Sequence, residues 1–141
     1  MRPSILVVLI GFVALSCGSD VQRIREQNIV GSWSSKAIYL NGVDANQYMP
    51  GLGTAKYLGL VEGGEYFGAY MTGTWALQGS QLQIHRAFVN PGSELWTYDV
   101  VGFSSDRLIL EIRLTESQYC CDFPEFGSDE VITIREVYER N

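Results

Sequence analysis

Two adjacent thiols are the residues whose type and spacing suggest chemistry most directly. Cys120 and Cys121 lie in the segment 115–130, which also carries aromatic and acidic residues. Consecutive Cα atoms are about 3.8 Å apart, whereas an ordinary disulfide joins Cα atoms roughly 4.4–6.8 Å apart. Three outcomes therefore stay open: reduced and partly packed thiols, a strained vicinal disulfide with a redox or conformational role, or bonding to another chain or, with Asp122, to a soft metal. Two thiols without a second Cys or His pair are a weak metal signal.

The sequence offers little for catalysis. His85 is the only histidine, and it falls on the face of its expected strand opposite to Leu82 and Ile84, which is typical of an exposed strand residue. No Gly-x-Ser-x-Gly turn, metal-ligand pair or phosphate-binding glycine loop before a helix is present, and no spacing selects a Ser-His-Asp set. We therefore expect a protein that is not an enzyme and that has no catalytic residue, no cofactor and no resident metal.

The third cysteine, Cys17, follows a segment typical of export signals. Arg2 precedes an apolar run over residues 5–15, which is shorter than the roughly 20 apolar residues needed to cross a bilayer core as a helix. Such a run suits the central region of a removable signal peptide. The four residues that end in Cys17 (Ala14-Leu15-Ser16-Cys17) resemble a bacterial lipobox, in which the cysteine thiol receives a diacylglyceryl group and cleavage falls just before it. An ordinary secretory signal with an incidental cysteine and a retained anchor are the alternatives.

The lipobox resemblance implies a domain organisation and a location. Residues 1–16 would be a lipoprotein signal peptide, 17–28 a lipidated cysteine with a tether that includes a short helix, and 29–141 a folded domain. More than one acyl chain on Cys17 would hold the protein stably at a membrane, where a single chain is marginal. We therefore expect a lipid-anchored protein of the bacterial cell envelope, at the outer membrane, on its periplasmic or surface face.

Composition and charge narrow the class of partner. The chain has 141 residues, of which 46% are hydrophobic and 18% charged, as expected of one globular domain. Its formal net charge is −6, and removal of Arg2, the one charged residue of segment 1–16, makes it −7. No run of Lys or Arg exists. We therefore do not expect the protein to bind nucleic acid through its phosphates. Membrane attachment would have to come from the lipid rather than from surface charge.

From Val30 onward the sequence predicts short strands. Runs rich in Tyr, Trp, Val, Ile, Leu and Thr are separated by Gly, Asn, Asp and Ser, a pattern typical of an all-β chain with regularly spaced turns. The predicted strands are 31–40, 55–61, 65–70, 73–77, 81–88, 95–103, 107–114 and 130–139. The clearest hairpin turn is 78–80, where Gly79 supplies the positive φ that such turns require.

Alternation along these strands predicts one buried and one exposed face. Leu108, Leu110 and Ile112 fall on one face of their strand, and Arg107 and Arg113 on the other. About eight such antiparallel strands close most economically as an up-and-down barrel, because closure removes exposed sheet edges. The sequence therefore predicts an all-β fold, an eight-stranded antiparallel up-and-down barrel.

Several short motifs follow one another along the predicted strands. The motifs are Gly31-Ser-Trp33, Gly64-Glu-Tyr66, Gly73-Thr-Trp75-Ala-Leu77-Gln-Gly79-Ser-Gln-Leu82-Gln-Ile84, Tyr98-Asp-Val100 and Leu108-Ile-Leu110. They resemble the lipocalin superfamily, and most closely the lipocalin-like domains of Bacteroidetes lipoproteins. The likeness covers roughly residues 29–138.

The resemblance implies structural roles at the closed end of the barrel. Gly31 and Trp33 would be structural, with the indole ring plugging that end, and an arginine of the last strand would stack over it by a cation–π contact. Arg135 is the candidate. It shares its face with Val131 rather than with Ile134, so a solvated position on the outer face is the alternative.

At the other end, the resemblance places the connection 41–53 over an open mouth. Tyr48, Met49 and Leu52 would form a lid there, or the segment is a solvent loop bounded by Gly and Pro. Side chains that would line a pocket, or else fill the interior as small barrels allow, are Tyr39, Tyr57, Tyr66, Trp75, Trp96 and Tyr98.

Two functions follow from this reading. The first is a small binding module that takes an apolar or amphipathic ligand in the barrel mouth without covalent chemistry. The second is a protein-interaction role through the loops, as a hydrolase inhibitor or a subunit of an envelope complex. A mouth cavity of at least about 300 Å³ would favour the ligand, and a filled barrel with an exposed aromatic patch over 119–126 would favour the protein partner.

Overall fold

The computed structural model describes residues 24–51, 57–68, 71–87, 93–119 and 123–141. Cys17, Leu52, Cys120, Cys121 and Asp122 lie outside the described residues, as does the segment 1–16. What the sequence predicts for them stays a prediction.

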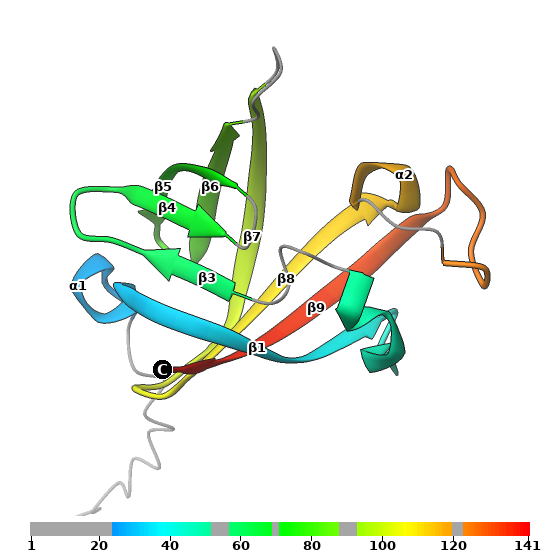
Figure 1. Ribbon diagram of the computed structural model, residues 1–141, viewed down its shortest axis with the longest axis horizontal. Helices are drawn as coiled ribbons and strands as arrows, with labels where there is room; N and C mark the ends of the chain where they lie inside the picture. Colours follow the sequence, from blue (N-terminus) through cyan, green and yellow to red (C-terminus); the bar gives the residue numbers. More distant parts are fainter. Residues whose placement is uncertain (1–23, 52–56, 69–70, 88–92, 120–122) are drawn as a thin grey trace, which may run out of the picture.

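One antiparallel sheet and three short helical segments make up the described chain (Figure 1). The strands are β1 (Gly31–Leu40), β2 (Val43–Asp44), β3 (Tyr57–Leu60), β4 (Glu65–Gly68), β5 (Thr72–Gln78), β6 (Gln81–Ala87), β7 (Ser93–Phe103), β8 (Arg107–Thr115) and β9 (Val131–Arg140). The helical segments are α1 (Glu26–Ile29), the 3-10 helix η1 (Asn46–Gly51) and α2 (Glu116–Tyr119).

The sheet closes on itself as a barrel. Strands β3 to β9 follow one another in chain order, β1 pairs with β3, and β1 also pairs with β9. Eight strands therefore form a closed up-and-down barrel, to which β2 adds a short ninth strand on β1. Figure 1 shows β1, β7, β8 and β9 as the long strands of the wall and β3 to β6 as shorter ones. The predicted fold class is confirmed, and the barrel is compatible with a lipocalin-like fold.

The alternation seen in the sequence explains why these strands form. Leu108, Leu110 and Ile112 are buried, whereas Arg107 and Arg113 on the same strand are exposed. Each fully buried Leu or Ile side chain contributes about 1.5–3 kcal/mol relative to an exposed one. The predicted turn between β5 and β6 is also confirmed, since its glycine at position 79 has a φ of 62°. Strand β2 and the segments η1 and α2 were not predicted.

The closed end of the barrel is built around Trp33. Its indole is fully buried and its Nε1 donates a hydrogen bond to the Ile29 carbonyl oxygen at 3.0 Å, which ties α1 to β1. The guanidinium of Arg140 lies 4.1 Å from the centre of the indole ring. Its Nη1 and Nη2 donate to the carbonyl oxygens of Val30 and Asn28 at 2.8 and 2.7 Å. A cation–π contact therefore seals this end, as the resemblance implies.

The arginine of that contact is Arg140 and not Arg135, so the prediction for Arg135 is wrong. Arg135 is exposed on the outer face and donates to the Glu111 carboxylate at 2.8 and 3.0 Å. Arg135 has an odd residue number, and the odd-numbered side chains of β9 point outward. Arg140 falls on the inward face at the end of the strand. Gly31 makes room for it, because a Cβ at that position would collide with the Arg140 guanidinium.

Candidate ligand-binding site at the barrel mouth

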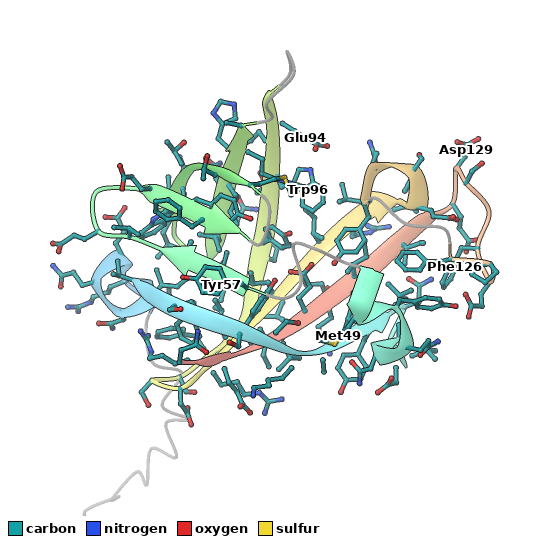
Figure 2. The ribbon with its side chains drawn as sticks, in the orientation of Figure 1. Met49, Tyr57, Glu94, Trp96, Phe126 and Asp129 are labelled. Carbon is teal, nitrogen blue, oxygen red and sulfur yellow. The ribbon has the colours of Figure 1, made fainter. Side chains whose placement is uncertain are left out.

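The mouth is the end of the barrel opposite to α1. Leu40, at the end of β1, pairs with Ile134 of β9, and the connections that carry η1 and α2 start from this end. In the right half of Figure 2, Met49 of η1 and Phe126 of the β8–β9 connection lie on the side where α2 joins β8. The two longest connections of the chain thus meet over the mouth.

A carboxylate is buried under these connections. Glu136 of β9 is 1% exposed and points into the barrel with Ile134 and Tyr138. The Tyr138 hydroxyl donates to its Oε2 at 2.7 Å, and the Tyr119 hydroxyl donates to its Oε1. Burial raises the pKa of the Glu136 carboxyl, although the two tyrosine hydroxyls and the Arg86 guanidinium act in the opposite direction. Glu136 is therefore an acceptor held in an apolar wall.

A guanidinium is buried beside it. Arg86 of β6 is 6% exposed, and its Cζ lies 3.9 Å from the centre of the Trp96 ring. Its Nε and Nη2 donate to the Met71 sulfur at 3.2 and 2.9 Å, and its Nη1 lies 4.0 Å from the Glu94 carboxylate. The barrel thus holds a cation and an acidic group that line the same small cavity.

Three tyrosines complete this set, which we call the polar cluster: Arg86, Glu136, Tyr66, Tyr98 and Tyr138. Burial raises the pKa of Tyr66 to about 12 and raises those of Tyr98 and Tyr138 well above 10. These phenols therefore stay protonated at neutral pH and act as hydroxyl donors. Chemically, the cluster can donate and accept hydrogen bonds.

Almost no space remains within the polar cluster. Its five residues line a cavity of about 10 Å³, together with Trp96 and three aliphatic side chains. That volume holds about one water molecule. Among the described residues the barrel interior is therefore filled, and any ligand larger than a water molecule must displace protein atoms.

Three aromatic side chains displace solvent from the mouth, and we call them the aromatic cover: Tyr48, Tyr119 and Phe123. The Tyr119 ring stacks on Trp96 with 5.7 Å between centroids and 23° between planes, and Phe123 follows at 6.3 Å from Tyr119. Tyr48 of η1 packs edge-on against Phe123 at 5.1 Å. The cover therefore runs from the barrel wall across both connections.

Polar contacts hold the cover in place. The Tyr48 hydroxyl lies 2.6 and 2.8 Å from the two carboxylate oxygens of Glu125, to which it donates. The Phe123 backbone N–H donates to the buried Glu116 carboxylate at 3.0 Å. The first contact joins η1 to the β8–β9 connection, and the second holds Phe123 within that connection.

The six aromatic residues predicted for the pocket separate into three groups. Tyr66, Trp96 and Tyr98 line the small cavity of the polar cluster. Trp75 is buried towards the closed end, where its Nε1 donates to the Val61 carbonyl oxygen at 2.9 Å. Tyr39 and Tyr57 are half-buried on the outer face, because both alternate with the inward residues of their strands. Tyr39 and Tyr57 therefore do not face the mouth, and Trp75 lines a cleft at the closed end instead.

Sequence reasoning missed the central residues of the cluster. Arg86 shares its strand face with Leu82 and Ile84, and Glu136 shares its face with Ile134 and Tyr138. A charged residue at an inward position of an alternating strand is the signal that could have found both. No pattern within the segment 115–130 indicates that Tyr119 turns inward.

Among the described residues, two further hollows lie outside the polar cluster. An apolar groove of about 150 Å³ runs between η1 and the β8–β9 connection, beside Tyr48 and Phe126, and Val43 at its edge is 69% exposed. A wider cleft of about 650 Å³ lies at the closed end, between α1 and the turn that joins β3 to β4. Neither brings together the buried donors and acceptors that the mouth holds.

Comparisons with known proteins add no family to this geometry. In the part of the chain that the structure describes, no helix is long and apolar enough to cross a membrane. Within the same residues, no three His, Cys, Asp or Glu side chains gather as metal ligands do. No protein-family model, no curated protein and no solved structure matches the chain.

Proposed function

We propose that this chain is a lipocalin-like lipoprotein that binds a small amphipathic ligand in its barrel mouth, without covalent chemistry. The lipobox-like sequence that ends in Cys17 supports a lipid anchor at the bacterial envelope. The barrel supports the binding function, since mouths of small barrels are common ligand sites. The one observation that carries the proposal is the polar cluster buried beneath the aromatic cover.

The polar cluster supports a binding function because burying its charged and polar groups costs folding free energy. Removing a charged or polar group from water costs several kcal/mol unless good partners replace the water. A barrel that only had to be stable could fill the positions of Arg86 and Glu136 with apolar side chains. A ligand with a polar group and an apolar body would use both the cluster and the aromatic surface around it.

The mouth lacks the open cavity of about 300 Å³ that would favour a ligand, so a ligand has to enter by displacing side chains. Because the cavity holds only about 10 Å³, binding requires the aromatic cover to move away from Trp96. The cover belongs to two connections rather than to the barrel wall, so it can move while the β-ladders stay intact. Loops move more readily than the elements that they connect.

A protein partner is the second candidate function. The groove beside Tyr48 and Phe126 is largely apolar, and Val43 next to it is 69% exposed. The aromatic patch that would favour a partner is only partly present, because Tyr119 and Phe123 are buried and Phe126 is half-buried. This leaves a smaller surface for a partner than the sequence led us to expect.

Native mass spectrometry of the full chain extracted from membranes would test the proposal. We expect a bound small molecule, and a rise in melting temperature with at least one compound from a panel of fatty acids, porphyrins and hydroxylated aromatic compounds. The variant Val43→Ser is the matched control, since it alters the groove and leaves the polar cluster intact. If no molecule co-purifies and no compound shifts the melting temperature, ligand binding is wrong, and a partner captured through Val43 would support the second candidate.

A further inference from the structure

We propose that the ligand of the mouth is a compact aromatic molecule that carries a hydroxyl group, and that Tyr119 occupies its place in the unliganded chain. This inference rests on the proposed binding function and names the class of ligand. It follows from what the barrel wall presents to Tyr119 and from where Tyr119 itself is attached.

The wall of the barrel presents a stacking surface and a hydrogen-bond acceptor together. Trp96 of β7 lies parallel to the Tyr119 ring within 23°, with 5.7 Å between the centroids, as in the offset stacks that aromatic rings prefer. Glu136 of β9 accepts the Tyr119 hydroxyl on Oε1. An aromatic ring with a hydroxyl group meets both requirements at once.

Tyr119 is not part of the wall that it completes. It belongs to α2, a helix of four residues in the β8–β9 connection. Tyr138, the other donor to Glu136, stands two residues away on the same strand and binds the second carboxylate oxygen. One carboxylate oxygen of Glu136 therefore accepts a hydrogen bond from a residue of the barrel wall, and the other accepts one from a residue of the β8–β9 connection.

One polar atom of the site still lacks a partner. The Trp96 Nε1 is buried and makes no hydrogen bond in the part of the chain that the structure describes. Trp96 is 3% exposed and lines the cavity of the polar cluster. A buried N–H without an acceptor is unfavourable, so a ligand with an acceptor atom beside its hydroxyl would improve on Tyr119.

Charge and space restrict the ligand further. A fatty-acid carboxylate cannot donate to Glu136 at neutral pH and would bring a second acidic group beside it, which opposes binding. Because only about 10 Å³ lies beyond the side chains already present, displacement of Tyr119 alone makes room for little more than one ring. A larger ligand would also have to displace Phe123.

Competition with Tyr119 makes the inference testable. If the Tyr119 side chain must leave before a ligand enters, the apparent association constant is the intrinsic one multiplied by the fraction of molecules in which Tyr119 has left the site. Removing the Tyr119 side chain should therefore strengthen binding. The hydroxyl should matter as well, because a hydrogen bond to a carboxylate changes affinity by about tenfold or more.

We would measure binding of 2-naphthol and of naphthalene, which lacks the hydroxyl, to the full chain by Trp fluorescence and calorimetry. We expect the wild-type chain to bind 2-naphthol, Tyr119→Ala to bind it about tenfold more tightly, and both to bind naphthalene about tenfold more weakly than 2-naphthol. Tyr119→Phe keeps the ring and frees the Glu136 oxygen, so it should bind 2-naphthol better than the wild type even if the alanine variant does not fold. Phe67→Ala, which removes an exposed ring on the outer face of β4, is the control and should leave binding unchanged.

Three results would overturn the inference. The first is binding to Tyr119→Ala but not to the wild-type chain, which would make Tyr119 a permanent part of the core. The second is equal affinity for 2-naphthol and naphthalene, which would mean that Glu136 does not recognise the hydroxyl. The third is wild-type binding of a fatty acid or porphyrin with no binding of 2-naphthol, in which case the proposed function stands and the ligand class is wrong.

Discussion

Replacement of Glu136 by glutamine gives a direct test of the polar cluster, because the two side chains are almost isosteric and only one can ionise. Burial raises the pKa of the Glu136 carboxyl above its ordinary value of 4.5, and the hydrogen bonds from Tyr119 and Tyr138 do not cancel this effect. A carboxyl with a raised pKa binds its proton more tightly in the folded chain than in the unfolded one. Its contribution to stability is therefore fully present below pH 4.5 and is lost as the pH rises through the folded-state pKa.

The size of the pH effect on stability follows from the titration of the single Glu136 proton. Between the unfolded and the folded pKa, the free energy of unfolding should fall by up to about 1.4 kcal/mol for each pH unit. The phenols that interact with the carboxyl do not titrate in this range, since burial raises their pKa values. These phenols are Tyr66, Tyr98, Tyr119 and Tyr138. The glutamine variant keeps an amide oxygen that accepts a phenol hydroxyl, so it should lack this decline.

Urea unfolding from about pH 4 to about pH 8, followed by Trp fluorescence, would measure it. We expect Glu136→Gln to gain stability over the wild-type chain progressively as the pH rises above about 4.5. The control is Glu139→Gln on the same strand, since Glu139 is exposed and pairs with Lys36 at 3.3 Å, and exposed pairs contribute little. A stability difference that does not change with pH would refute the raised pKa, and a wild-type chain that gains on Glu136→Gln as the pH rises would show that the hydrogen bonds outweigh burial.

Three further changes test the closed end, the wall and the anchor. Arg140→Met should lower the free energy of unfolding by about 2–4 kcal/mol, because backbone hydrogen bonds and the cation–π contact are lost, whereas Arg135→Met on the outer face should change it by less than about 1 kcal/mol. Gly73→Ala should cost about 2 kcal/mol or more in thermal unfolding, since its Cβ would collide with a backbone carbonyl of β6, while Gly127→Ala has open space and should be nearly neutral. Cys17→Ser should move the protein from the membrane pellet to the soluble fraction, and a variant that stays in the pellet would rule out the lipid anchor.

The barrel could be predicted from the sequence because its signals are local. Each strand alternates with a period of two, as Leu108 and Leu110 illustrate, and the tight turn at Gly79 separates two such runs. Closure of the sheet followed from the number of strands and the cost of open edges. None of these arguments needs a contact between distant residues.

The parity of residue numbers along β9 could have identified the arginine that contacts Trp33. The inward residues of the last strand are even-numbered, as Ile132 and Ile134 show. Arg140 has that parity, and Arg135 does not. The strand was predicted to end at residue 139, one residue too early, so the arginine that seals the barrel lay just outside the predicted element. Strand ends are where pattern reasoning is weakest.

The position of Tyr119 could not be predicted in this way, because long-range contacts create it. A helix of four residues is not stable by itself in water. Here α2 is placed by the stack on Trp96, by the hydrogen bond to Glu136 and by the contact between Glu116 and the Phe123 N–H. Each partner is distant in the chain or lies across a turn, so no periodicity in the segment 115–130 indicates it.

The two ends of the barrel differ in what their buried polar groups contribute to stability, and this difference favours the mouth as the proposed ligand site. At the closed end, Arg140 is fixed by backbone carbonyl oxygens and an indole ring, so its burial stabilises the fold. At the mouth, Glu136 has a raised pKa and the Trp96 N–H has no acceptor among the described residues, so both reduce stability. Departures from local consistency of this kind are expected at functional sites rather than in purely structural cores. A molecule that accepts from Trp96 and replaces the Tyr119 hydroxyl on Glu136 would satisfy the unpaired N–H and keep both hydrogen bonds to the carboxyl, which is the physical reason to look for a ligand at the mouth and not at the wider cleft beside α1.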